Sequence, residues 1–156
     1  MKTPSRVFFA LVATAAGLFA APDAMAADCT AVVESNDAMQ FNVRALAVPK
    51  ACQVFAVTLK HVGKLPKAAM GHNLVITKAV DMGATATDGI VAGVTNDYVK
   101  PQDARVIAHS KLIGGGETTT VEIAVAKLAA GTDYVFFCSF PGHSAIMKGT
   151  LALKGS

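Results

Sequence analysis

The stretch that links the last two predicted strands reads Cys138-Ser139-Phe140-Pro141-Gly142-His143-Ser144-Ala145-Ile146-Met147. Four residues separate the cysteine from the histidine, and three separate the histidine from the methionine. The sequence predicts strands on both sides, over residues 134–138 and 149–154. Because Pro141-Gly142 is a strong turn signal, we expect the loop to fold back and bring the thiol, the imidazole and the thioether to one point.

A second imidazole is available upstream, where Gly71-His72-Asn73 opens another predicted strand, residues 72–77. Two imidazoles, one thiolate and one thioether form the ligand set of a trigonal copper site with a weak axial sulfur. Thiolate and thioether favour Cu(I), whereas imidazole also suits Cu(II), so such a site can exchange an electron with little rearrangement. We therefore expect one copper ion and an electron carrier, with Met147 as the weaker ligand.

Each of these residues also has an ordinary structural explanation. A buried cysteine or methionine is usually part of a core, and His72 by itself would be a histidine at the start of a strand. Their confinement to one short loop, together with a strand-initial histidine, favours the metal site. Zinc is the next candidate, since it binds cysteine and histidine but has little use for a thioether.

The remainder of the chain predicts an all-β fold. Strands are expected over residues 39–43, 53–60, 105–108 and 118–125. In residues 53–60, Phe55, Val57 and Leu59 share one face. The Ala-, Gly- and Thr-rich segment 78–94 is the one candidate for a short helix outside the sheets. About seven short strands predict a two-sheet Greek-key sandwich, with a small closed barrel as the alternative.

Residues 1–26 predict a secretory signal peptide. Lys2 and Arg6 precede the apolar run of residues 7–21, and Ala24-Met25-Ala26 has the small-residue pattern of a cleavage site. The run is shorter than the roughly 20 residues of a membrane span. Cleavage after Ala26 would leave residues 27–156 as a single domain, exported to the periplasm without a membrane anchor.

Export permits disulfides, and the chain has three cysteines. Three pairings are possible. The histidine and methionine that follow Cys138 favour a disulfide between Cys29 and Cys52 and a free thiol at Cys138. Closing a loop of this size stabilises a protein by roughly 3 kcal/mol in the chain-entropy model.

The chain resembles the azurins, a family of bacterial periplasmic blue-copper proteins, over essentially all of residues 27–156. The spacing of Cys138, His143 and Met147 is similar to theirs, and plastocyanin-like relatives have a shorter Cys-to-His gap. Other similar stretches are residues 36–42, 70–73, 98–101, 105–109 and 136–138. The resemblance implies an eight-stranded Greek-key cupredoxin sandwich with one short helical flap, and the same Cys29–Cys52 disulfide. One departure is Leu74, which stands where the best-known azurins have a buried tryptophan.

Within the site, the resemblance implies additional contacts. The carbonyl of Gly71 would lie opposite Met147 as a distant fifth ligand. Asn73 would brace the two ligand loops, and the amides of Asn73 and Phe140 would point at the sulfur of Cys138, where such hydrogen bonds orient ligands and tune the potential.

Two further histidines have different expected roles. His61 matches a histidine that in azurins lies near the site and titrates with redox state. His109 is expected at the surface, without a role in metal binding.

The resemblance also implies an exit for the electron, because it places the edge of His143 at the surface within an apolar patch. Such a patch would suit transient contact with redox proteins, such as c-type cytochromes and copper-containing reductases. The candidates for the patch, each of which has buried core as its alternative, are Met39, Leu65, Ala69, Met70, Ile90, Pro141 and Ala145.

Other functions compete with electron transfer. Periplasmic copper storage or delivery would use exchangeable Met- or His-rich ligands, but the chain has only six methionines, of which Met1 and Met25 fall in the predicted signal peptide. An enzyme with Cys138 as nucleophile and His143 as base lacks an acidic orienting group nearby, so we expect no catalysis. The lysines and arginines are scattered, which gives no reason to expect nucleic acid, and we expect a monomer.

Overall fold

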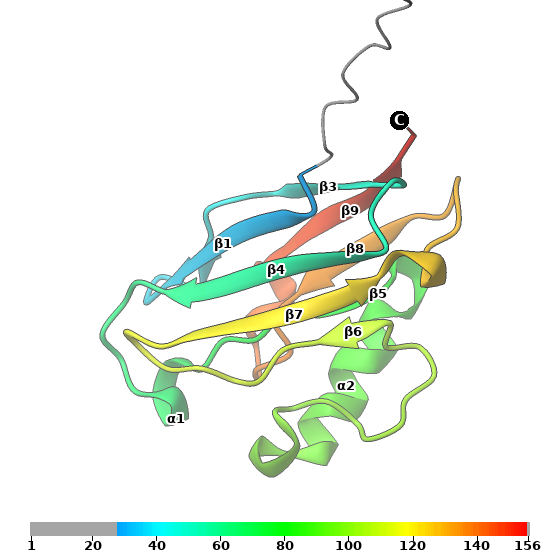
Figure 1. The fold of residues 1–156 in the computed structure, drawn as a ribbon. Helices are drawn as coiled ribbons and strands as arrows, with labels where there is room; N and C mark the ends of the chain where they lie inside the picture. The colour runs from blue at the N-terminus through cyan, green and yellow to red at the C-terminus, as the bar shows by residue number, and fades with distance from the viewer. Residues whose placement is uncertain (1–27, 156) are drawn as a thin grey trace, which may run out of the picture.

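The computed structural model describes residues 28–155, which form two stacked β-sheets with a helix on the outside of one of them (Figure 1). The predicted signal peptide lies outside the described residues, so its cleavage stays a prediction. Within the described range, the helices are too short to cross a bilayer.

The first sheet has the strand order β2-β1-β4-β7 and the second has the order β3-β9-β8-β5-β6. Most neighbours are antiparallel, but β1 pairs with β4, and β3 with β9, in parallel. In chain order the strands are β1 (Thr30–Asn36), β2 (Gln40–Phe41), β3 (Ala45–Pro49), β4 (Val54–His61), β5 (Val75–Lys78), β6 (Ala108–His109), β7 (Thr118–Ala124), β8 (Tyr134–Phe137) and β9 (Lys148–Lys154).

β2 and β3 are two halves of one strand that leaves the first sheet and joins the second across residues 42–44. Such bends let a strand contribute to both layers of a sandwich. With the two halves counted as one, the fold is the eight-stranded sandwich that the resemblance implies, and two separate sheets stand in place of the alternative closed barrel.

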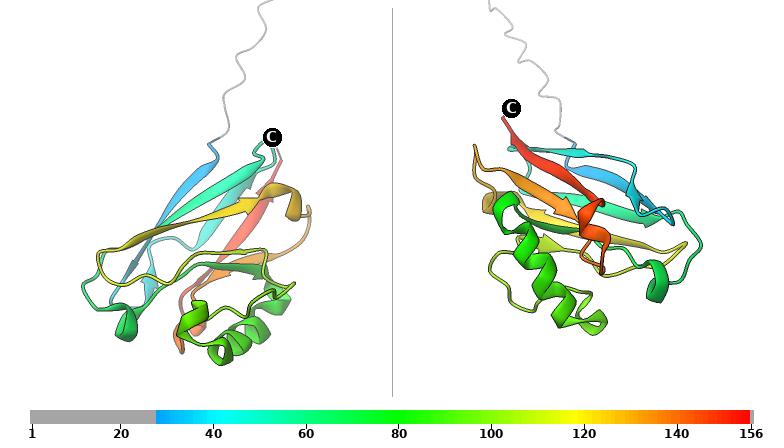
Figure 2. Two further views of the ribbon diagram at one scale, coloured as in Figure 1. Left: turned by 60° about the horizontal axis from the view of Figure 1, so that its bottom comes forward. Right: turned by 180° about the vertical axis from the view of Figure 1, so that it is seen from behind.

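The helical segments are short, and the longest is α2. They are α1 (Lys67–Met70), η1 (Ala79–Asp81), α2 (Met82–Ala92), η2 (Val94–Asn96), η3 (Val125–Lys127) and η4 (His143–Ala145). The predicted helix within residues 78–94 is therefore confirmed. In all views of Figures 1 and 2, the loop between β8 and β9 lies between α1 and α2 at one end of the sandwich.

Alternating side chains divide the interior into two cores. Phe55, Val57 and Leu59 on β4 are at most 2% exposed and face the space between the sheets, as the predicted alternation requires. On β8, Phe136 belongs to the same core, whereas Phe137 packs with α2 on the other side of the sheet. The second sheet is therefore covered on both faces near β8, the strand that leads into Cys138.

The strand predictions need correction in several places. The sequence patterns missed β1 and β3. Of the predicted strands, residues 39–43 are reduced to Gln40–Phe41, residues 72–77 form a strand only from Val75, and residues 105–108 give way to Ala108–His109. Arg105 instead donates hydrogen bonds to Asp88 on α2 and to Asp103. This cluster holds Arg105 beside the helix, and the amide of Ile107 is the point where the connection first bonds to β5, at the carbonyl of Ile76.

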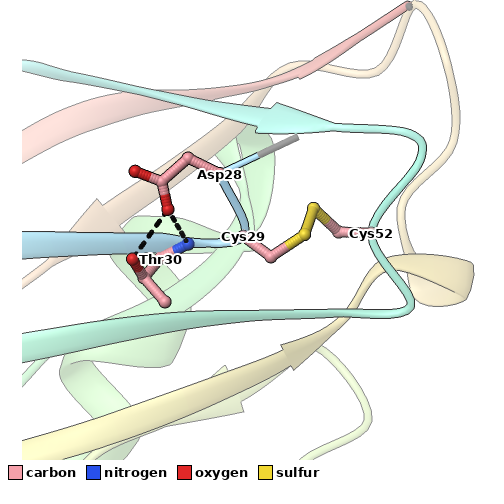
Figure 3. The surroundings of a disulfide bond; sticks show 4 residues. All are labelled: Asp28, Cys29, Thr30 and Cys52. Carbon is pink, nitrogen blue, oxygen red and sulfur yellow. Dashed lines mark hydrogen bonds between the residues drawn. A yellow bond between two sulfur atoms is a disulfide. The ribbon is translucent and has the colours of Figure 1, made fainter. Parts of the chain in front are cut away.

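The disulfide joins Cys29 and Cys52, as predicted (Figure 3). Cys29 directly precedes β1, and Cys52 lies in the turn between β3 and β4. Next to it, the carboxylate of Asp28 accepts hydrogen bonds from the backbone amide and the hydroxyl of Thr30. The bridge therefore fastens the start of the first described strand to the turn that joins the two sheets.

Candidate metal centre

His72 lies just before β5 and is held by both its backbone and its ring. Its amide and carbonyl exchange hydrogen bonds of 2.9 Å with Ile113. Its ring Nε2 lies 3.0 Å from the carbonyl oxygen of Asn36. Because a carbonyl can only accept, Nε2 carries the proton, and Nδ1 presents its lone pair 3.8 Å from the sulfur of Cys138.

Cys138 and Met147 face each other as a continuation of the β8–β9 ladder. The register pairs Phe137 with Lys148, and the next pair is closed by a hydrogen bond of 3.0 Å from the amide of Cys138 to the carbonyl of Met147. Opposite residues of an antiparallel pair project to the same face. Both side chains are fully buried in the core between the sheets.

His143 stands in the short helical turn η4 within the loop that joins β8 and β9. Gly142 has a φ of 82°, which a glycine adopts without strain, so the predicted Pro-Gly turn reverses the chain here. The carbonyl of His143 accepts the amide of Met147 at 2.8 Å. Its ring Nδ1 lies 3.6 Å from the sulfur of Cys138.

The three donors have the spacing that a small trigonal metal site requires. The ligand atoms of His72, Cys138 and His143 all lie within 4.8 Å of one another. Bonds of about 2.3 Å to sulfur and 2.0 Å to nitrogen, as found for zinc, give a sulfur–nitrogen separation of about 3.7 Å at a trigonal angle. The observed distances of 3.6 and 3.8 Å agree with this value. With a thioether residue opposite the thiol, the donor set fits copper.

Burial keeps the metal-binding groups neutral in the metal-free protein. It raises the pKa of the Cys138 thiol to about 12, although the backbone amides of Asn73 and Phe140 donate towards the sulfur and oppose the rise. Burial also lowers the pKa of His72 to about 4 and lowers the pKa of His143 below its usual value. Both imidazoles are therefore unprotonated near neutral pH, with lone pairs available to a metal.

Asn73 connects the segment that carries His72 to the loop that carries Cys138. Its side-chain amide donates to the carbonyl of Asp97 at 2.7 Å and to the hydroxyl of Ser139 at 2.8 Å, and its oxygen accepts the amide of Ser139 at 2.9 Å. The carbonyl oxygen of Gly71 lies 3.8 Å from the Cys138 sulfur. The sequence analysis did not identify Ser139 as part of this network. Its position next to Cys138 is the one feature of the sequence that could have indicated it.

The two remaining histidines differ in burial. His61 is 1% exposed, its Nε2 lies 3.1 Å from the carboxylate of Asp37, and its ring stands edge-on to that of His72 with centroids 4.4 Å apart. Its Nδ1 is buried without a hydrogen-bond partner. His109 is exposed in β6, with Nδ1 3.2 Å from a backbone carbonyl of the next residue.

The residues expected in the apolar patch are all at least partly accessible. Leu65 is 41% and Ile90 50% exposed. Ala69, Pro141 and Ala145 are also exposed, while Met39 and Met70 are half-buried. The structure adds Ile146, which is 49% exposed and directly precedes Met147. Its apolar side chain in the ligand loop was a signal that the prediction did not use.

A two-sheet Greek-key sandwich with a buried His-Cys-His cluster at one end defines a cupredoxin, the class of type 1 copper proteins. The comparisons identify the family within that class. A family model described as "Copper binding proteins, plastocyanin/azurin family" matches residues 27–154. The chain belongs to this family.

Individual relatives agree with the family match. The chain is similar to Azurin-2 of Alcaligenes xylosoxydans xylosoxydans, at 61% identity over 81% of this chain and 98% of the relative. It is also similar to an azurin of Alcaligenes faecalis, at 59% identity over 80% and 98%. A solved structure of azurin Az-iso2 from Methylomonas sp. strain J has a TM-score of 0.79 and 44% identity, covering 82% and 99% of the two chains. The chain is a blue-copper electron-transfer protein that binds one copper ion.

Proposed function

We propose that His72, Cys138 and His143 hold the copper, with Met147 as a weak axial ligand and the Gly71 carbonyl as a more distant one. The observation that carries this assignment is the convergence of both Nδ1 atoms on one buried sulfur, at 3.6 and 3.8 Å. When bound, copper supplies a one-electron couple between Cu(I) and Cu(II). The chain keeps water away from the site, since each of the four side chains is at most 3% exposed.

The hydrogen bonds around the ligands limit how far they can move when the charge of the site changes. The carbonyl of Asn36 orients the ring of His72, Asn73 ties the two ligand segments together, and the amides of Asn73 and Phe140 direct partial positive charge at the thiolate. Groups fixed in this way lower the rearrangement that accompanies electron transfer and stabilise a thiolate despite its burial.

The electron is proposed to leave through His143. Its side chain is 3% exposed, whereas His72, Cys138 and Met147 are each 0% exposed. The patch defined by Met39, Leu65, Ala69, Met70, Ile90, Pro141 and Ala145, to which we add Ile146, would surround this exit. Partners are then redox proteins in transient contact, with c-type cytochromes and copper-containing reductases as the candidates.

The colour of the protein tests the ligand assignment. Cu(II) added to the metal-free protein is expected to produce an intense blue thiolate-to-copper band, and Cys138→Ser is expected to abolish it. A colourless protein with one tightly bound copper would contradict the assignment. Rapid loss of copper to a chelator would instead favour the alternative function of storage or delivery, and rapid alkylation of Cys138 in the loaded protein would favour a catalytic thiol.

A pair of surface variants tests the exit. Leu65→Lys places a charge in the patch, and Val54→Lys adds the same charge at a side chain of similar exposure, 41% against 44%. Val54 begins β4, and His61 ends it near the metal site, so Val54 lies at the far end of the sandwich. We expect the first variant alone to slow electron exchange with a cytochrome. Equal rates for the two variants would contradict the exit at His143.

The protein is further proposed to be an exported, periplasmic carrier, in keeping with its predicted signal peptide and its disulfide. A carrier rather than an enzyme is supported by the donor set, because protein groups occupy the positions that a substrate would need. Edman or mass analysis of the protein purified from the periplasmic fraction is expected to give Ala27 as the first residue.

A further inference from the structure

Arg44 lies at the bend between β2 and β3, where the strand passes from one sheet to the other. Its guanidinium Nη1 donates to the carbonyl of Ile146 at 3.0 Å and lies 3.4 Å from the carbonyl of Lys148. These two carbonyls belong to the residues on either side of Met147. One cationic side chain therefore bridges the carbonyls of the two residues that flank the proposed axial ligand.

The β3–β9 ladder ends just short of these carbonyls, and the carbonyl of Ile146 also accepts the amide of Lys148 at 3.2 Å. β3 pairs with β9 only from the Ala45–Thr150 pair onward, so residues 146–148 extend beyond the end of β3. The amide of Cys138 bonds to the carbonyl of Met147. Because neighbouring carbonyls of a strand point to opposite sides, the carbonyl of Lys148, the first residue of β9, points away from β8, and the guanidinium of Arg44 lies on that side.

The backbone of Arg44 holds the same segment. Its carbonyl accepts the amide of Thr150 at 2.9 Å. A Cβ on Gly149 would come within 2.7 Å of that carbonyl and would clash with the Phe136 ring, so the bend and β9 approach as closely as they do because residue 149 is a glycine. The main chain and the side chain of Arg44 therefore form hydrogen bonds with residues at both ends of the segment 146–150.

We propose that Arg44 is a positioning residue for Met147, acting through the two flanking carbonyls. A methionine side chain has three rotatable bonds and little conformational preference of its own. A long, weak bond to copper cannot hold such a side chain in place, so the backbone from which it projects must be fixed. The inference rests on the proposed role of Met147 as the axial ligand.

The test compares copper-loaded full-length variants. R44A removes the donors and one positive charge. K148Q also removes one positive charge, from the segment that Arg44 bridges, and leaves the guanidinium in place, so it is the matched control for charge. R44K restores the charge and offers a donor of different shape. The readouts are the midpoint potential, the visible and EPR spectra, and hydrogen exchange of the amides of residues 146–148 in the metal-free protein.

We expect R44A to shift the potential and the spectra beyond the effect of K148Q, and R44K to recover part of the difference. In the metal-free protein, R44A should speed exchange of these amides about fivefold, the size of effect expected for loss of one hydrogen bond. In the M147L background, the excess effect of R44A on the potential should disappear. Identical shifts in R44A and K148Q, or an excess that survives in M147L, would overturn the inference.

The same variants separate this inference from the ligand assignment. If M147L alone leaves the potential and spectra unchanged, the assignment of Met147 as a ligand fails, and the role of Arg44 fails with it. If M147L shifts them but R44A matches K148Q, only the positioning role is wrong. Arg44 is exposed, and far-UV circular dichroism checks that R44A is folded.

Discussion

Copper binding to the metal-free protein should release one proton at neutral pH, and that proton should come from Cys138. Burial raises the pKa of this thiol to about 12, so at pH 7 it is protonated before the metal arrives. Copper binds the thiolate, and the proton must therefore leave. The two imidazoles add nothing to this count at pH 7, since burial lowers the pKa of His72 to about 4 and also lowers the pKa of His143.

The free energy needed to deprotonate Cys138 follows from the difference between the pH and the pKa of its thiol. Deprotonating the thiol at pH 7 lies five pKa units uphill, which costs about 7 kcal/mol. The copper–thiolate bond must exceed this cost. The apparent dissociation constant should fall tenfold for each unit that the pH rises, in the window above the titration of the histidines and below pH 12.

The assay is a titration of metal-free protein with Cu(I) under anaerobic conditions, in weak buffer with a pH indicator. We expect one proton per ion at pH 7, and more near pH 4, where about half of His72 is protonated before binding. Cys138→Ser is expected to release none at pH 7, and Met147→Leu is expected to release one, like the natural sequence.

Two results would refute the reasoning. Absence of proton release at pH 7 would mean that the thiol is already ionised or does not bind the metal. Release of two or more protons would mean that an imidazole is protonated in the metal-free protein, contrary to the effect of burial on both histidines.

Three further predictions concern stability and potential. The folded chain depresses the pKa of His72 from about 6.5 to about 4, so the unfolded chain binds more protons between these pH values. The metal-free protein should therefore lose up to about 3 kcal/mol of stability as the pH falls from 6.5 to 4. Urea unfolding at several pH values measures this loss, and an equal dependence of the unfolding free energy on pH in a His72→Gln variant would contradict it. Leu74 is 0% exposed, and Leu74→Ala should cost about 2–5 kcal/mol in urea unfolding, with less than about 1 kcal/mol counting against a packed core at this position. Met147→Leu should keep the blue band and shift the midpoint potential, whereas loss of the band would make Met147 more than an axial ligand.

The local patterns predicted the strands whose two faces differ in polarity. Residues 53–60 alternate cleanly, and β4 buries the three apolar side chains expected. β3 has the sequence Ala-Leu-Ala-Val-Pro, in which both faces are apolar, so the alternation of its buried Leu46 and Val48 is not visible. In β1 the inward positions include a serine, Ser35, and an outward position holds Val32, which is 50% exposed. Packing and pairing with β4 overrode the pattern there.

The ligand loop was readable because it is local. Cys138, His143 and Met147 lie within one short turn between paired strands, so their spacing along the chain already restricts their spacing in three dimensions. The chemistry of the donors then restricted the metal. The disulfide is not local in this sense, because Cys29 and Cys52 meet only when β1 and the β3–β4 turn are in place. Counting the cysteines alone therefore left three possible pairings.

The sequence by itself predicted a β-sandwich, with a closed barrel as the alternative, and a Cys-His-Met loop suited to copper, because these predictions depend on periodicity, turn residues and side-chain chemistry over short distances. Only the tertiary structure decided which nitrogen of His72 faces the sulfur, since the Asn36 carbonyl that orients the ring lies 36 residues away. It also decided that Arg44 reaches the carbonyl of Ile146, 102 residues further along the chain. The first contact joins the end of β1 to the segment before β5 in the other sheet, and the second depends on the parallel pairing of β3 with β9. Neither pairing is contained in a local sequence pattern.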